Sequence, residues 1–121
     1  METVSKIEYH ILRFTTNDKN LDLTGAKLFS KEMFEESLKC SCNKVLIIGD
    51  LYSETLSSAE LIVLGEYHAH IMPSIINMAV ACSEKYLEKL KLWEEVCVSR
   101  GANVKIFLDE KSAIEWLNQI A

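Results

Sequence analysis

The stretch Val45–Leu64, VLIIGDLYSETLSSAELIVL, carries the clearest structural signal in the chain. It opens with four consecutive apolar residues, 45–48, and such an unbroken run is typical of a strand that is buried on both faces of a sheet. A break at Gly49-Asp50 and a polar loop over residues 49–56 follow, and then an amphipathic segment. The stretch therefore predicts a central strand that leads into a helix through a hydroxyl-rich loop, a frequent location for sites in α/β proteins.

The start of that helix is marked by a capping box. In Ser57-Ser58-Ala59-Glu60, a hydroxyl at the N-cap is followed three residues later by a Glu. We expect Ser57 to cap a helix over Ser58–Ile71, which Pro73 ends. The helical period places four residues on the core side: Leu61, Leu64, Gly65 and His68. It places three on the outward side: Val63, Tyr67 and His70.

Two further pairs of strand and helix follow along the chain. Residues 75–81 and 104–108 are apolar runs, and helices are expected after them over 84–99, capped by Ser83, and over 110–120, capped by Asp109. Parallel strands need crossover connections, and helices supply them here. The strands near 45–48, 75–81 and 104–108 are therefore predicted to be parallel neighbours.

The residues before the central strand predict a hairpin and a short helix. Ser5–Thr15 has the alternation of a strand, residues 17–20 have turn composition, and Leu21 and Leu23 resume the alternation in a second arm over 20–24. Ser30 is expected to cap a helix over Lys31–Lys39. The predicted fold class is α/β, with four helices and a mixed sheet whose N-terminal hairpin adds a partly antiparallel edge.

Composition narrows the class of protein. A length of 121 residues predicts one domain over 1–121, and 49% apolar with 26% charged residues is ordinary for a soluble globular protein. A net charge of −5, with lysines scattered among acidic residues, argues against nucleic acid as a partner. No apolar run approaches the roughly 18 residues that a membrane span needs, and residues 1–16 lack the apolar region of a signal peptide. We expect a cytoplasmic protein without membrane insertion.

No pattern of catalytic or metal-binding residues stands out. The four cysteines are expected to be free buried thiols: Cys40, Cys42, Cys82 and Cys97. Cys40-Ser41-Cys42 is tighter than the usual zinc knuckle, and no second pair follows at zinc-site spacing. His68 and His70 would point roughly 200° apart on a helix, so they cannot share one ion. We therefore expect no metal site, no cofactor and no enzymatic activity.

Asp50 follows a predicted buried strand, as the phospho-acceptor aspartate of receiver domains does. Receiver domains also need an acidic pair near the first strand, which this chain does not have. A role in stabilising the loop is the expectation for Asp50.

The C-terminal third resembles the STAS-like proteins, relatives of bacterial anti-sigma-factor antagonists that include small single-domain members of unassigned function. The matching pattern, over residues 100–117, is R-G-x-x-V-x-x-F-x-D-x-x-x-A-x-x-W-L. The apolar strand that ends in Asp50, followed by a Ser-rich turn into a helix, is similar to the place where antagonists carry a regulatory phosphoserine. The resemblance implies a STAS-like fold and regulation through a protein partner, for which an anti-sigma-like kinase is the candidate. Self-association of the chain is the alternative.

The phosphoserine motif of that family, Asp-Ser-Ser-Gly-Leu, is altered here to Ser57-Ser58-Ala59-Glu60-Leu61. Without a gap, the phosphorylated position of the family falls on Ala59, whereas a one-residue gap places Ser58 there. The resemblance makes Ser58 and Ser57 the candidate phosphosites.

The expected partner surface joins the loop to the outward face of the helix. Its residues are Asp50, Tyr52, Ser53, Ser57, Ser58, Val63, Tyr67 and His70. The spacing of Val63 and Tyr67 indicates an exposed apolar patch. A second hypothesis is a small apolar, lipid-like ligand held under the helices at 58–71 and 84–99, because some STAS-like proteins resemble lipid-transfer domains in fold.

Overall fold

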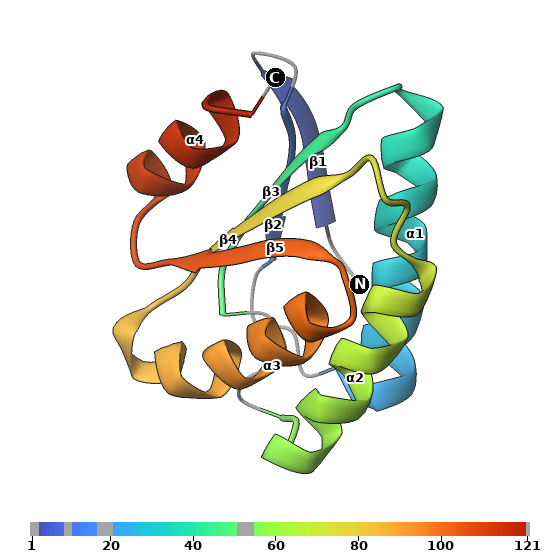
Figure 1. Ribbon diagram of the computed structural model, residues 1–121, viewed down its shortest axis with the longest axis vertical. Helices are drawn as coiled ribbons and strands as arrows, with labels where there is room; N and C mark the ends of the chain where they lie inside the picture. The colour runs from blue at the N-terminus through green and yellow to red at the C-terminus, as the bar shows by residue number, and fades with distance from the viewer. Residues whose placement is uncertain (1–2, 9–10, 17–20, 51–54, 121) are drawn as a thin grey trace.

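A computed structural model describes residues 3–8, 11–16, 21–50 and 55–120, and in these ranges five strands form one mixed sheet (Figure 1). The strands lie side by side in chain order: β1 (Thr3–Glu8), β2 (Ile11–Thr16), β3 (Lys44–Ile48), β4 (Asn77–Ala81) and β5 (Asn103–Phe107). β1 is antiparallel to β2, and β2 to β5 are parallel to one another. β3 is the middle strand of the five, as its apolar run predicts.

In the part of the chain that the structure describes, four α-helices pack on this sheet: α1 (Leu23–Lys39), α2 (Ser58–Ile71), α3 (Leu87–Ser99) and α4 (Glu110–Asn118). A short 3-10 turn, η2 (Glu84–Tyr86), precedes α3. The predicted α/β class, with four helices and parallel last three strands, is confirmed for the described residues.

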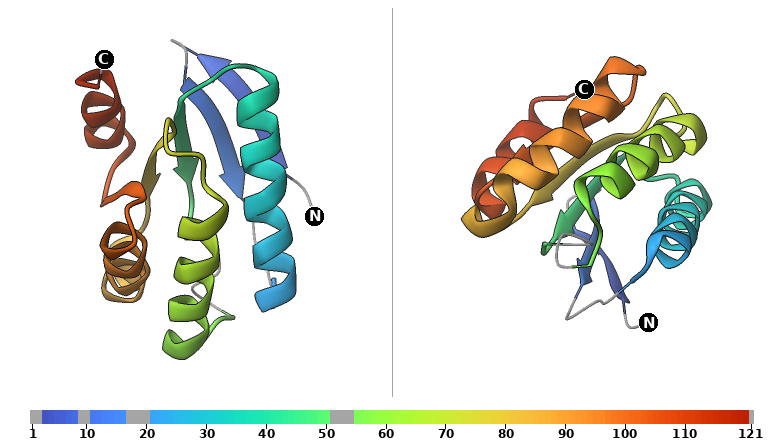
Figure 2. Two further views of the ribbon diagram at one scale, coloured as in Figure 1. Left: turned by 45° about the vertical axis from the view of Figure 1, so that its right-hand side comes forward. Right: turned by 90° about the horizontal axis from the view of Figure 1, so that it is seen from below.

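The helices form two layers of unequal size. α1, α2 and α3 cover one face of the sheet, and α4 covers the opposite face (Figure 1). Both views of Figure 2 show α1 and α2 side by side. β3 contributes to both cores, because successive side chains of a strand point to opposite faces. Val45 and Ile47 pack under the three-helix layer, and Leu46 packs against Ala113 and Leu117 of α4.

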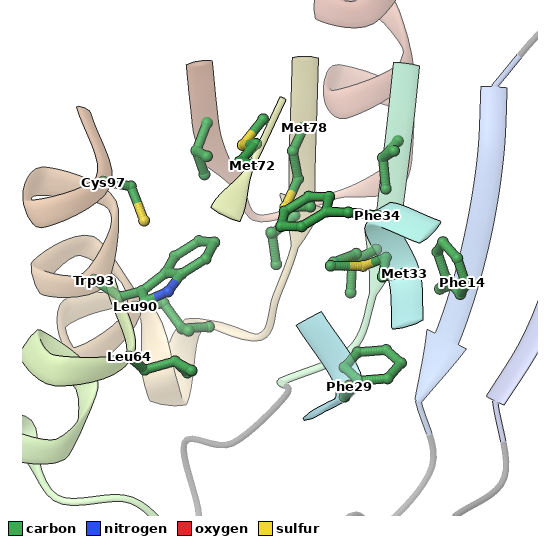
Figure 3. Packing of buried hydrophobic residues seen from close by; sticks show 14 of the residues in the cluster. Phe14, Phe29, Met33, Phe34, Leu64, Met72, Met78, Leu90, Trp93 and Cys97 are labelled. Carbon is green, nitrogen blue, oxygen red and sulfur yellow. The ribbon is translucent and has the colours of Figure 1, made fainter. Parts of the chain in front are cut away.

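The larger core is filled by side chains from all three of its helices. Figure 3 shows the rings of Phe34 from α1 and Trp93 from α3 in one cluster with Met78 of β4. α2 and α3 approach closely at Gly65, where an added Cβ would lie 3.0 Å from the Cβ of Val96. This contact explains a glycine inside a helix, where glycine is otherwise unfavourable.

The predicted bounds of the hairpin and of the first helix are wrong, whereas the turn predicted at 17–20 lies outside the described residues. The hairpin lies within residues 3–16, so the single strand expected over Ser5–Thr15 is two strands. The described part of the expected second arm, residues 21–24, is instead the entry into α1. The Oδ1 atom of Asp22 accepts a hydrogen bond from the N–H of Gly25 at 2.8 Å, so Asp22 is the N-cap. Ser30, the expected cap, is buried in the middle of the helix.

The physical reason is burial: a long helical stripe of apolar residues buries more surface against the sheet than the short alternation of two leucines would. Ala26, Phe29 and Met33 are three and four residues apart, and all are buried against the sheet. Burial of this stripe extends the helix by two turns before the segment that the sequence favours.

Replacing Asp22 by alanine tests the corrected start of α1. The variant removes the hydrogen bond to Gly25, and we expect it to lower the free energy of unfolding by about 1 kcal/mol. Urea unfolding followed by circular dichroism measures the change. Thr24→Ala, at an exposed neighbouring position, is the matched control. Equal midpoints for the two variants would contradict the assignment of Asp22 as the cap.

Candidate functional site

The residues that connect β3 to α2 form the candidate site. We call the described part of this connection, residues 49–50 and 55–58, the β3–α2 corner. Tyr52 and Ser53, which belong to the expected partner surface, lie outside the described residues. Gly49 has φ of 135°, a conformation that L residues with side chains rarely adopt, so glycine is needed where the chain leaves the sheet.

Hydrogen bonds tie both ends of the corner to distant parts of the chain. The Oδ1 atom of Asp50 accepts the N–H of Ser83 at 2.6 Å, which joins the end of β3 to the end of β4. The hydroxyl of Thr55 donates to the carbonyl of Leu21 at 2.7 Å, and Nζ of Lys89 donates to the carbonyl of Leu56 at 2.6 Å. Asp50 has the loop-stabilising role expected from the sequence. The Ser83 side chain makes no cap bond to η2, contrary to the prediction.

The capping box at the start of α2 is confirmed. The Ser57 hydroxyl accepts the N–H of Glu60 at 3.1 Å, and the Glu60 carboxylate accepts the N–H of Ser57 at 3.0 Å. Ser57, Ser58 and Ala59 are all exposed. The first turn of α2 is therefore both accessible and held in one geometry.

The outward face of α2 is partly apolar. Val63 is 41% exposed and His70 is exposed, as predicted, whereas Tyr67 is half-buried beneath Nζ of Lys27, 5.3 Å from the ring centroid. Ile62 is 38% exposed and was missed by sequence reasoning. The signal was available, because Ile62 lies four residues after Ser58 and so shares its side of the helix.

His68 and His70 occupy opposite environments. His68 is 1% exposed, and its ring packs edge-on between those of Phe34 (4.8 Å between centroids) and Trp93 (5.0 Å). Nε2 of His68 and Nε1 of Trp93 are buried without a hydrogen-bond partner. Burial lowers the pKa of His68 to about 3, so its ring is neutral at physiological pH. In the described ranges, no three His, Cys, Asp or Glu side chains gather as metal ligands would.

Open hollows lie on the surface formed by the described residues, and we describe two of them. One, of about 430 Å³, is lined by Glu66, Ala69, His70 and Arg100, with an ion pair between Arg100 and Glu66. The other, of about 620 Å³, lies along α4 and is lined by Glu110, Lys111, Ile114 and Glu115. The contact of α2 with α3 at Gly65 is close. The proposal of an apolar ligand under these helices gains no support from that packing.

Comparisons of the chain with protein-family models, curated proteins and solved structures find no match. No helix among the described residues combines the length and apolarity needed to cross a bilayer.

The burial of His68 predicts a loss of stability in acid. Its pKa in the folded state, about 3, lies below the ordinary value of 6.5, so the unfolded chain binds the extra proton first as the pH falls. The stabilisation that comes from the neutral His68 ring is fully present above pH 6.5, and the free energy of unfolding then falls by up to about 1 kcal/mol per pH unit toward pH 3. The measurement is the urea midpoint as a function of pH.

The variant His68→Phe should flatten this dependence relative to the unsubstituted chain, whereas His70→Gln, at an exposed position of the same helix, should leave it unchanged. The slope with pH, not the absolute stability, is compared, so a change in packing does not obscure the result. Parallel curves for the unsubstituted chain and His68→Phe would contradict the role assigned to His68.

Proposed function

We propose that this chain is a cytoplasmic, non-enzymatic regulatory domain with a STAS-like fold, which binds a protein partner through the β3–α2 corner and the outward face of α2. The observation that supports it most directly is the combination of exposed hydroxyls, Ser57 and Ser58, with exposed apolar side chains, Ile62 and Val63, on one helix start. The similarity of the C-terminal third to relatives of anti-sigma-factor antagonists points to the same role.

The anchoring of the corner favours recognition. Bonds from Asp50, Thr55 and Leu56 to three other segments, together with the capping box, hold the first turn of α2 before a partner arrives. A preorganised surface loses less conformational entropy on binding than a mobile one. Ile62 and Val63 supply an apolar centre, and the serines supply part of a polar rim, which is the usual anatomy of a protein interface.

Ser58 is the phosphosite that we propose. Its side chain is exposed at the first helical position, where a phosphate dianion meets the positive end of the helix dipole. The Ser57 hydroxyl is already an acceptor in the capping box, and a phosphate there would face the Glu60 carboxylate. The one-residue gap in the family motif leads to the same serine. Phosphorylation would add charge at the edge of the apolar centre and release the partner.

Capture of partners by a tagged chain, in cells that express the protein naturally, tests this proposal. Val63→Asp should reduce the captured partner by about tenfold or more, because a charge would be desolvated at the centre of the interface. Val98→Asp is the matched control: Val98 is also an exposed helical valine, at 52%, but lies on α3. The proposed surface would be contradicted if both variants reduced the captured partner equally, or if neither reduced it.

Replacing Ser57 and Ser58 by aspartate, one at a time, distinguishes a role in capping the helix from a role in regulating partner binding. Aspartate is itself a good N-cap, so Ser57→Asp should preserve the start of α2, whereas Ser58→Asp should weaken capture. Intact-mass and phosphopeptide measurements on the natural protein would show phosphate at Ser58.

Native mass spectrometry of the purified chain distinguishes the alternatives: a stable dimer favours self-association, and a co-purifying lipid favours the apolar-ligand hypothesis.

A further inference from the structure

The end of α1 brings two thiols together. The N–H of Cys42 donates to the carbonyl of Ser37 at 2.9 Å, and the N–H of Ser41 donates to the carbonyl of Leu38 at 3.2 Å. This pair of bonds is the Schellman motif, in which the residue after the helix cap adopts the left-handed conformation. Ser41 has φ of 58°, a value usually left to glycine. The backbone therefore reverses between Cys40 and Cys42.

The reversal places the two sulfur atoms 2.7 Å apart, against about 2.05 Å in a disulfide bond. The position of Cys42 is fixed from a second side, because the buried hydroxyl of Ser37 donates to the Cys42 carbonyl at 2.9 Å. Cys40 is half-buried, whereas Cys42 is 9% exposed. One thiol of the pair is therefore accessible from solvent, and the other lies directly behind it.

We propose that Cys40 and Cys42 are a redox-active dithiol that reacts with low-molecular-weight disulfides and closes to an intramolecular disulfide. This inference is independent of the proposed partner surface. It assigns a modification site to the end of α1, where the chain turns toward β3.

The reaction takes two thiol–disulfide exchanges. The Cys40 thiolate attacks one sulfur of a small disulfide, RSSR, forms the mixed disulfide Cys40–S–S–R and expels the first thiol as RS⁻, which takes up a proton. The Cys42 sulfur then gives its proton to solvent, attacks the Cys40 sulfur and expels the second thiol. In sum, two protein thiols lose two electrons and two protons, and one RSSR becomes two RSH.

The order of attack follows from the surroundings of the two sulfurs. Burial, and then the hydrogen bond and charge of Cys40, raise the pKa of Cys42 to about 11. Cys42 is therefore a thiol at neutral pH and is the resolving group, whereas the more accessible Cys40 is the attacking group. A metal ion would need Cys42 as a thiolate and further ligands, and the described residues offer no cluster of three.

The remaining cysteines provide internal controls. Cys97 is fully buried, its S–H donates to the carbonyl of Gly65 at 3.7 Å, and burial raises its pKa to about 12. Cys82 is buried at the end of β4, and burial also raises its pKa. Both should stay reduced under conditions that oxidise the pair at the end of α1.

The test treats the fully reduced chain with oxidised glutathione and follows intact mass, free thiols and the disulfide-linked peptides. The unsubstituted chain should lose two hydrogens and two of its four thiols, with the bond mapped to Cys40 and Cys42. Cys42→Ser should stop at a glutathione adduct on Cys40, and Cys82→Ser should close as the unsubstituted chain does. A persistent adduct on the unsubstituted chain, a bond to Cys82 or Cys97, or no reaction would overturn the proposal.

A second measurement tests the part played by the fold. The equilibrium constant for closure, measured against dithiothreitol, should be at least about tenfold larger in native buffer than in denaturing urea, because the Schellman motif preorganises the sulfurs. Ser41→Gly, which suits the left-handed conformation, should retain this advantage, and Ser41→Val should reduce it. Equal constants in native and denaturing conditions would overturn the structural basis of the proposal.

Discussion

Burial of β3 on both faces is the constraint on which the rest of the structure depends. Val45 and Ile47 need cover from α1, α2 and α3, and Leu46 needs cover from α4. At roughly 25 cal/mol per Å² of apolar surface removed from water, a strand of this kind is stable only when both layers form. Its parallel neighbours β2 and β4 follow from the same requirement, because crossover helices place cover on the faces of a sheet.

The two chemically distinctive features of the chain lie at opposite ends of this strand. The Cys40–Cys42 pair precedes β3 at its amino end, and the β3–α2 corner follows its carboxyl end. Both are places where backbone N–H and carbonyl groups leave regular structure and must find other partners. At the amino end a Schellman motif pairs such groups, and at the described parts of the carboxyl end Asp50 and the capping box do so. The same requirement that ends each element also positions the side chains proposed to act there.

The main core contains polar atoms whose burial lowers its stability. His68 and Trp93 each bury a ring nitrogen without a partner, and an unpaired buried polar group costs on the order of 1–3 kcal/mol. The edge-on contacts of the His68 ring with Phe34 and Trp93 offset part of this cost, since such aromatic pairs contribute about 0.5–1.5 kcal/mol each. α2 therefore carries an inner histidine, His68, whose pKa differs between the folded and unfolded states, and an outer histidine, His70, that is exposed to solvent.

The sequence by itself determined the features that depend on local spacing: the α/β class, β3 as the middle strand, the bounds of α2, and the caps Ser57 and Asp109. These follow from hydrogen bonds or periodicities within a few residues. Only the tertiary structure decided the start of α1 at Leu23, because burial of Ala26, Phe29 and Met33 against the sheet outweighs the strand-like alternation of Leu21 and Leu23. It also decided the partner of Asp50 and the approach of the Cys40 and Cys42 sulfurs, because each depends on where the backbone turns and on what packs beside it.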